Sequence, residues 1–312
     1  MTEKIAPRDT YGKTLVELGR ENPDIVVLDA DLSKSTMTKY FAKEFPERFF
    51  ECGIAEQNMV SIAAGLAGAG KIPFASTFAV FMPGRSFDQI RMSVAQPSFN
   101  VKLVATHAGI SVGEDGTSHQ SIEDLALIGA LPGFTIIVPA DSIETAQAVR
   151  VAAATPGPFY IRLGRPKVSL VYDESYRFEL GKAVTLRPGK DVTIIAIGLM
   201  VGEALQAATD LAGRGIDCRV INLPTLKPVD EAAIIQAAKE TKAIVTAEEH
   251  LEHGGLGSLV AQVTGRHYPV PLEFVAMKDR YAESGKDVEL LQKYGLSAAG
   301  ISAAVGEVIK RK

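Results

Sequence analysis

The sequence predicts an α/β protein made of two domains, each built on a parallel sheet. Short β-branched runs alternate with alanine-rich helical segments along most of the 312 residues. The runs end in polar residues or proline, which is typical of buried parallel strands. A polar stretch broken by Gly and Pro interrupts the alternation before residue 190, and the same pattern then starts again.

The first unit contains three clear strand segments and three clear helical segments. The strand segments are residues 25–31 (IVVLDAD), 101–107 (VKLVATH) and 134–140 (FTIIVPA). Helical spacing marks residues 14–22, 61–70 and 142–155, and the last segment has a capping residue at Asp141 or Ser142. This order predicts a parallel sheet that is covered by helices on both faces.

The second unit starts at residues 192–198 (VTIIAIG). It continues with a helix at 203–215, the segment CRVINLPTLKP at 218–228, a helix at 232–241, a strand at 243–250 and a last helix at 301–312. The boundaries follow from the interruption. We assign residues 1–175 to a first domain, 176–189 to a linker and 190–312 to a second domain.

Composition and charge argue against several classes of protein. The formal net charge is −4, so no basic surface for nucleic acid or an anionic membrane is expected. No apolar run reaches the roughly 18 residues of a membrane span, and residues 1–13 lack the apolar core of a signal peptide. The two cysteines, Cys52 and Cys218, match no disulfide or metal-binding spacing. We therefore predict a cytoplasmic protein.

Glu56 stands at the start of a predicted helix whose faces are all apolar or small (MVSIAAGLAGAG, 59–70). An acid in the first turn can simply favour the positive end of the helix dipole. However, the apolar surroundings predict that the helix start is buried. A buried carboxylate is costly unless it is paired, hydrogen-bonded or protonated, and a carboxyl held in this way can share a proton with a nitrogen base.

Two further segments stand out. In STFAVFMPGR (76–85), Phe78 and Phe81 are three residues apart and could be core residues or a wall for a flat heterocycle. The Gly-rich segment THAGISVGEDGTSHQ (106–120) holds His107 and His119 and is neither a dinucleotide nor a P-loop fingerprint. It follows a predicted strand, and function collects at the carboxyl ends of parallel strands. Its polar side chains therefore indicate a binding or catalytic site.

Basic and histidine side chains suggest further hypotheses. Arg8, Arg162 and Arg165 could bind phosphate, or they could be surface residues with local ion pairs. A metal site from His107 and His119 has no matching ligand spacing. In EEHLEHGGLG (248–257), a strand end that leads into a Gly-rich helix start is favoured over a metal pair.

Together, GIAEQNM (53–59), STFAVF (76–81) and HAGISVGEDGTSHQSIED (107–124) resemble the pyrimidine-binding half of thiamine-diphosphate enzymes of the transketolase family. The segments from VTIIAIG to YAESGKDVELLQKYGLSAAGI resemble the C-terminal domain of that family. The GDG…N motif with which the family binds Mg²⁺ and the diphosphate is absent. The chain thus resembles the C-terminal subunit of a split transketolase.

The resemblance implies roles for the residues that match the family's motifs. Glu56 would bond to a ring nitrogen of the aminopyrimidine of thiamine diphosphate and so promote formation of the reactive ylid. Phe78 and Phe81 would hold the pyrimidine ring, and Asp31 would lie near the thiazolium. His119 would contact the oxygens of the donor sugar, and Asp115 a sugar hydroxyl. The groups implied to bind the sugar phosphate are Arg8, Ser35, His107 and Arg165.

The resemblance also implies partners. A homodimer of this chain would form the core of an α2β2 heterotetramer, and an N-terminal subunit would hold the diphosphate with Mg²⁺ or Ca²⁺. The reaction implied is transfer of a two-carbon ketol unit from a phosphorylated ketose to an aldose phosphate. Two alternatives stay open. Gln57 and the Ala108-Gly109 pair favour deoxyxylulose-phosphate synthase, and the chain length fits the beta subunit of a 2-oxo acid dehydrogenase. A protein that only binds a partner is disfavoured, because Glu56 and the loop histidines are present.

Overall fold

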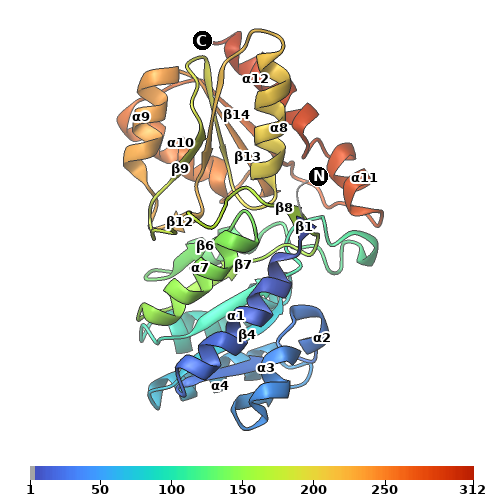
Figure 1. The fold of residues 1–312 in the computed structure, drawn as a ribbon, viewed down its shortest axis with the longest axis vertical. Helices are drawn as coiled ribbons and strands as arrows, with labels where there is room; N and C mark the ends of the chain where they lie inside the picture. Colours follow the sequence, from blue (N-terminus) through green and yellow to red (C-terminus); the bar gives the residue numbers. More distant parts are fainter. Residues whose placement is uncertain (1–3) are drawn as a thin grey trace.

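The computed structural model describes residues 4–312, which form two lobes stacked along the long axis of the molecule (Figure 1). The lower lobe in that view holds the N-terminal part of the chain. Its elements are β1 (Lys4–Ile5), α1 (Pro7–Glu21), β2 (Ile25–Asp29), α2 (Ser33–Thr36), α3 (Lys39–Glu44), η1 (Pro46–Arg48), β3 (Phe49–Glu51), α4 (Glu56–Gly68), β4 (Ile72–Phe78), α5 (Met82–Gln89), the π-helix η2 (Ile90–Ala95), β5 (Lys102–Thr106), η3 (Gly113–Asp115), α6 (Asp124–Gly129), β6 (Thr135–Ile137), α7 (Ser142–Ala154), β7 (Phe159–Arg162) and β8 (Val168–Ser169).

The upper lobe in Figure 1 holds the C-terminal part of the chain. Its elements are β9 (Val184–Arg187), β10 (Val192–Ala196), α8 (Met200–Ala212), β11 (Cys218–Asn222), β12 (Thr225–Lys227), α9 (Glu231–Thr241), β13 (Ile244–Leu251), α10 (Leu256–His267), β14 (Leu272–Met277), α11 (Asp287–Lys293) and α12 (Ala298–Ile309). No helix among residues 4–312 is long and apolar enough to cross a membrane.

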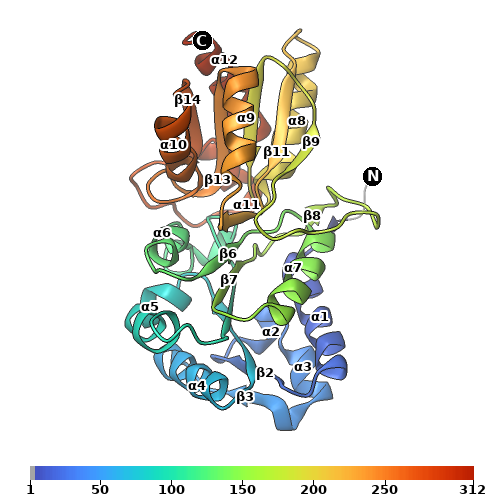
Figure 2. The same cartoon turned by 90° about the vertical axis from the view of Figure 1, so that its left-hand side faces the viewer.

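The lower lobe is built on a seven-stranded sheet with the order β12-β6-β7-β5-β4-β2-β3. All neighbouring pairs are parallel except β12 with β6. Figure 2 shows α4, α5 and α6 on one face and α1, α3 and α7 on the other. The β-branched residues of β2, β5 and β7 are buried between these layers, which explains why their sequences are apolar almost throughout. The predicted fold class is therefore confirmed.

The upper lobe contains a five-stranded sheet with the order β14-β13-β10-β11-β9. Three of its four strand pairings are parallel, and the fourth joins β9 to β11 as an antiparallel edge strand. Helices α8 and α12 contact each other, and α9 contacts α10, so that the pairs cover opposite faces of the sheet (Figure 2).

Three elements differ from the sequence prediction. Residues 184–187, inside the segment predicted to be a linker, form the edge strand β9. Residues 225–227, predicted to belong to the second unit, instead extend the sheet of the first lobe as β12. Helix α4 is not buried on every side, because Gln57, Ser61 and Ile62 are exposed in the single chain. In each case the sequence pattern of the segment does not determine the sheet or surface against which the segment packs.

The predicted cap of the helix at residues 142–155 is present. Asp141 is the N-cap residue of α7, and its Oδ1 accepts a hydrogen bond of 2.8 Å from the backbone N–H of Glu144. Its Oδ2 accepts from the N–H groups of Val171 and Tyr172, at 2.7 and 2.9 Å. The cap thus also ties the chain that leaves the first lobe to the end of α7.

Candidate active site

The sequence-predicted site residues follow the carboxyl ends of neighbouring strands. Asp31 lies two residues after β2, Glu56 begins α4 after β3, and Phe78 is the last residue of β4. His107 directly follows β5, and Arg165 follows β7. Because β3, β2, β4, β5 and β7 are side by side in parallel, these ends meet at one edge of the sheet.

Glu56 is buried, with 4% of its surface exposed, as the sequence predicts. Its Oε1 accepts a hydrogen bond of 2.7 Å from Nη1 of Arg85. The Arg85 side chain is 45% exposed, so the buried acid is paired with a group that reaches in from solvent. Sequence reasoning missed Arg85, although it ends the STFAVFMPGR segment that carries the aromatic pair.

The space beside Glu56 suits a flat nitrogen-containing ring. The rings of Phe78 and Phe81 are nearly parallel, with centroids 5.8 Å apart and planes 13° apart. The planar guanidinium of Arg85 lies 3.9 Å from the Phe81 ring centroid while it donates to Glu56. It makes the two contacts that an aminopyrimidine would make here, stacking and an N–H···O bond. The residues present therefore fit such a heterocycle.

His107 forms the next layer of the site. Its ring stacks on Phe78 at 3.8 Å, Nδ1 lies 2.9 Å from Oγ1 of Thr106, and Nε2 lies 3.4 Å from Nη1 of Arg8. Burial first, then the charges of Arg8 and Arg165, lower the pKa of His107 to about 3. The imidazole is therefore neutral at physiological pH. An Nδ1–H that donates to Thr106 leaves Nε2 as an acceptor for Arg8.

His119 lies at the edge of the aromatic pair. Its ring centroid is 6.1 Å from that of Phe78 and 5.4 Å from that of Phe81, and both contacts are edge-on. Its Nδ1 is 2.9 Å from Oγ of Ser118. The structure thus brings together both predicted histidines and both predicted aromatic residues.

Arg8 and Arg165 form a cationic region beyond His107. Arg8 Nη1 donates to the backbone oxygen of Ser35 at 2.8 Å. Arg165 Nη1 donates to the carbonyl of Val112 and lies 3.7 Å from Oδ2 of Asp115. Of the residues that the resemblance implies for the sugar phosphate, Arg8 therefore contacts Ser35 and His107, while Arg165 lies beside Asp115, the residue implied to contact a sugar hydroxyl.

Arg162 does not belong to this cationic region, which corrects the hypothesis that it could bind phosphate. Its guanidinium is 5% exposed, and its Nε donates to Oδ2 of Asp124 at 2.8 Å. Asp124 also accepts a hydrogen bond of 2.8 Å from the hydroxyl of Tyr160. Its Nη2 also donates to Asp124 and to the backbone oxygens of Ser121 and Glu249. Because Glu249 belongs to the second lobe, Nε and Nη2 of Arg162 are used in contacts that link the two lobes.

Asp31 is exposed and has a positive φ of 62°, and its N–H donates to Glu51 Oε1 at 2.7 Å. The turn that carries it is held by Asp29. The buried carboxylate of Asp29 accepts hydrogen bonds from Leu32 N–H and from the hydroxyls of Thr36 and Thr38. Burial raises the pKa of Asp29 to about 6. The Asp29-Ala-Asp31 sequence thus combines a buried residue that shapes the turn and an exposed residue that faces the site edge.

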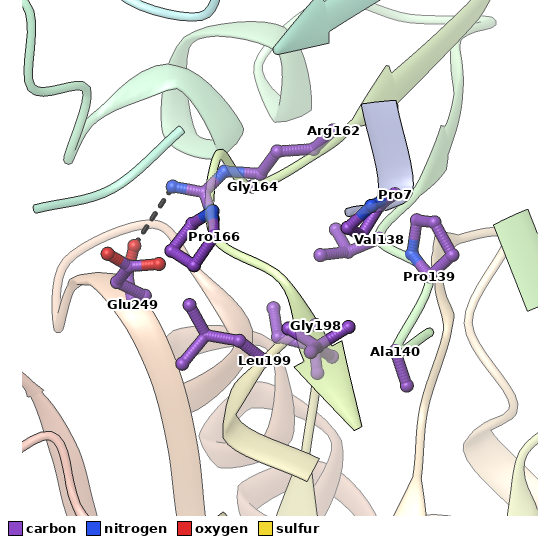
Figure 3. Close-up of a pocket in the computed structure, with 12 residues that line it drawn as sticks. Pro7, Val138, Pro139, Ala140, Arg162, Gly164, Pro166, Gly198, Leu199 and Glu249 are labelled. Atoms are coloured by element: carbon purple, nitrogen blue, oxygen red, sulfur yellow. Dashed lines mark hydrogen bonds between the residues drawn. The ribbon is translucent and has the colours of Figure 1, made fainter. Parts of the chain in front are cut away.

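The second lobe fixes the histidine loop through Glu249. Its carboxylate accepts hydrogen bonds from the N–H of Ser111, at 2.5 Å, and from its hydroxyl, at 3.1 Å. Arg162 donates to the backbone oxygen of Glu249 at 2.9 Å, as Figure 3 shows. A Cβ on Gly109, where φ is +77°, would lie 2.1 Å from the Glu249 carboxyl carbon, so glycine is required there. Burial raises the pKa of Glu249 to about 7.

The EEHLEHGGLG segment is a strand end followed by a helix start, as predicted. His250 lies on β13, His253 lies in the turn after it, and α10 begins at Leu256. Within residues 4–312, no group of three or more His, Cys, Asp or Glu side chains is arranged to hold a metal ion.

The fold is that of an α/β protein with two mainly parallel sheets, and aromatic, histidine and charged side chains gather at the carboxyl ends of the first sheet. The family description "Transketolase, pyrimidine binding domain" matches residues 3–169, and "Transketolase, C-terminal domain" matches residues 181–301. The chain belongs to the transketolase family.

Relatives cover the chain almost completely. A protein described as a transketolase C-terminal section from Methanocaldococcus jannaschii is 47% identical over 98% of this chain and 96% of its own length. A 6-deoxy-6-sulfo-D-fructose transketolase subunit from Clostridium sp. is 44% identical over 98% of this chain and 95% of its own length. A solved structure described as a split gene transketolase, inactive beta4 tetramer, superposes with a TM-score of 0.93 at 54% identity and covers 99% of both chains.

Proposed function

We propose that the chain is the C-terminal subunit of a transketolase that moves a two-carbon ketol unit from a phosphorylated ketose to an aldose phosphate. The observation that carries the proposal is the buried Glu56, which begins α4 and binds a flat N–H donor stacked on Phe81. The pyrimidine-binding domain that matches residues 3–169 implies thiamine diphosphate as the cofactor. The cofactor supplies the carbon nucleophile of the reaction.

This chain's residues then bind and orient the pyrimidine end. Glu56 would hold a proton on a ring nitrogen, Phe78 and Phe81 would contact the ring, and Asp31 would lie near the thiazolium. Exclusion of water strengthens the hydrogen bond to Glu56, because the local dielectric constant is lower than that of bulk water. Arg85 must leave when the ring enters, and its 45% exposure leaves it a path into solvent.

The other residues of the site are proposed to hold the sugar. His119, at the edge of the aromatic pair, contacts the donor's oxygens, and Asp115 accepts from a sugar hydroxyl. The terminal phosphate is bound by Arg8, His107 and Arg165, together with Ser35 in α2. Holding the two reactants in one geometry is the main contribution that such residues make to the rate.

The chain is proposed to act in an α2β2 heterotetramer whose N-terminal subunits hold Mg²⁺ or Ca²⁺ and the diphosphate. A homodimer of this chain would form the core, with α4 near its centre. In the single chain α4 exposes Ile62, and Ile54, just before α4, is 74% exposed. A Cβ on Gly65 would meet nothing within 4 Å, which leaves room for a second backbone. The relative described as an inactive β4 tetramer supports self-association without activity.

A transfer assay tests the proposal. The chain is co-expressed with its candidate N-terminal subunit and supplied with thiamine diphosphate, Mg²⁺, xylulose 5-phosphate and ribose 5-phosphate. We expect two-carbon transfer by the complex and none by either subunit alone. Absence of transfer with every phosphorylated ketose would refute the proposed function.

Other donors separate the alternatives. Ketol transfer from 6-deoxy-6-sulfofructose would match the activity in the name of the clostridial relative. Condensation of pyruvate with an aldose phosphate would indicate a synthase, and oxidative decarboxylation would indicate a 2-oxo acid dehydrogenase subunit. Gly109 is weak support for a synthase, because close packing against Glu249 already explains why this residue is glycine.

A further inference from the structure

A cavity of about 320 Å³ lies between the two lobes, next to the cationic region of the site. Both lobes line it. The first contributes Arg8, Ser111, Val112, Gly113, Glu114, Arg165 and Pro166, and the second contributes Lys286 and Asp287. Three residues with cationic side chains, Arg8, Arg165 and Lys286, therefore line one cavity, and one of them comes from the C-terminal part of the chain.

The cations of the first lobe are incompletely neutralised. Nε of Arg8 is buried and has no hydrogen-bond partner among residues 4–312. Burial is the main cause that lowers the pKa of Arg8, and repulsion by the charge of Arg165 is the second cause. The nearest acid to Arg165 is Asp115, at 3.7 Å. An anion with several oxygens would relieve the repulsion and use the free Nε–H.

The segment that carries Lys286 is packed directly on the histidine loop. Nε2 of Gln120 donates to the backbone oxygen of Glu283 at 3.0 Å. A Cβ on Gly116 would lie 2.3 Å from Oγ of Ser284, and a Cβ on Gly113 would lie 3.3 Å from the oxygen of Gly285. These contacts fix the backbone of residues 283–286 relative to Arg165. The position of Lys286 at the cavity is thus set by the fold.

The Lys286 side chain can turn toward the cavity. Its present ionic partner is Glu289, at 3.6 Å, and the two side chains are 71% and 67% exposed. An exposed pair of this kind contributes little to stability, so a bound anion can replace it. Two carboxylates, Glu114 and Asp287, also line the cavity. Oδ1 of Asp287 accepts from the N–H of Val288 at 2.9 Å.

We propose that Lys286 is a specificity-determining residue that binds the terminal oxyanion of the sugar substrate together with Arg8 and Arg165. The ligand class is a tetrahedral oxyanion, a phosphate monoester or a sulfonate. The inference rests on the proposed function. A phosphate monoester carries more negative charge than a sulfonate at neutral pH, so the third cation favours the phosphate more strongly. The C-terminal domain would thereby take part in substrate choice.

The test variant is Lys286→Met in the complex with the N-terminal subunit. For xylulose 5-phosphate and ribose 5-phosphate we expect KM to rise about fivefold while kcat changes less than about twofold. The rise should be smaller for a ketose 6-sulfonate and absent for erythrulose, which has no charged end. Lys286→Arg should restore most of the affinity. Added salt should reduce the difference between wild type and Lys286→Met.

Lys239→Met is the matched control, because it removes the same charge from α9, an exposed helix that contacts α10, β10 and β13. It should leave every KM unchanged. Calorimetric binding of ribose 5-phosphate to the complex gives a readout that does not depend on turnover. Equal affinities of wild type and Lys286→Met in that measurement overturn the inference. Lack of transfer by the wild type, with binding still weakened by Lys286→Met, overturns only the proposed function.

Discussion

A buried glutamate lies at the start of α4, and another, Glu248 on β13, lies against the start of α10; the two differ in which groups pair with the carboxylate. At α10, Glu248 is fully buried and accepts hydrogen bonds from the N–H groups of Leu256 and Gly257, at 2.7 and 2.8 Å. At α4, Glu56 has one side-chain partner, the half-exposed Arg85. The first carboxylate is held by backbone that cannot move away, and the second by a side chain that can.

We propose that this difference separates a structural acid, Glu248, from a functional one, Glu56. Glu248 completes the helix start, and Gly255 is glycine because a Cβ there would lie 2.1 Å from Glu248 Oε2. Glu56 keeps its acceptor oxygen available to any flat donor that displaces Arg85. Burial alone therefore does not identify a site in this chain. We propose that Glu56 is marked as a site residue by its partner, Arg85, whose half-exposed side chain can move into solvent.

Glu56→Gln gives the largest expected effect and tests the proposed role of Glu56 in activity. General acid–base groups contribute roughly 10²–10⁴-fold to rates, so we expect transfer by the complex to fall by about 10³-fold at saturating cofactor. The thermal midpoint of the chain should change by only a few degrees, because the amide keeps the packing. Glu47→Gln, which alters a 69% exposed carboxylate of the same lobe, is the control. Near-normal activity of Glu56→Gln would remove the role assigned to this residue.

Glu248→Ala tests the proposal that Glu248 contributes to stability and not to activity. It leaves two buried N–H groups without an acceptor, and each costs about 1–3 kcal/mol. We expect the free energy of unfolding to fall by roughly 3 kcal/mol, measured by urea denaturation, while kcat/KM of the folded complex changes less than about twofold. Glu248→Gln should lose less stability, since one acceptor oxygen remains. A large loss of activity without a loss of stability would reverse the two roles.

Glu249 is a third buried carboxylate, and its hydrogen-bond partner, Ser111, lies in the other lobe. Burial raises its pKa to about 7, while Arg162 and the hydrogen bonds from Ser111 oppose the rise. The folded state thus binds the proton more tightly than the unfolded state. The stability contributed by that proton is fully present below about pH 4.5 and is lost as the pH rises through about 7.

Glu249→Gln should remove this pH dependence. Relative to wild type, the variant should gain about 2 kcal/mol of unfolding free energy between pH 5 and pH 8. Denaturant midpoints at both pH values, measured for each protein, check the prediction. Taking the difference between variant and wild type cancels Asp29 and Glu144, whose raised pKa values of about 6 and about 7 act in the same window. An unchanged difference across the window would contradict the prediction.

Arg85→Met gives the smallest effect and addresses the mobile partner itself. The cofactor must displace the Arg85–Glu56 ion pair, so the variant should bind thiamine diphosphate about two- to fivefold more tightly. The same change should destabilise the chain without cofactor, because the charge of Glu56 is left buried and unpaired. Cofactor titration and thermal unfolding of the same samples measure both effects. Weaker cofactor binding would mean that Arg85 contacts the cofactor directly.

The sequence by itself determined the two α/β units, the burial of Glu56 and the position of Asp31 and His107 at the ends of parallel strands, while Phe78 and Arg165 were assigned to the site through the family resemblance. It could do so because apolar runs define parallel strands, and parallel strands bring their carboxyl ends to one edge. Only the tertiary structure decided that Arg85 pairs with Glu56, that Glu249 binds Ser111, 138 residues away in sequence, and that Lys286 lines the same cavity as Arg8 and Arg165. These contacts depend on how the lobes and helices dock, and a side chain's local sequence does not specify the surface that it meets.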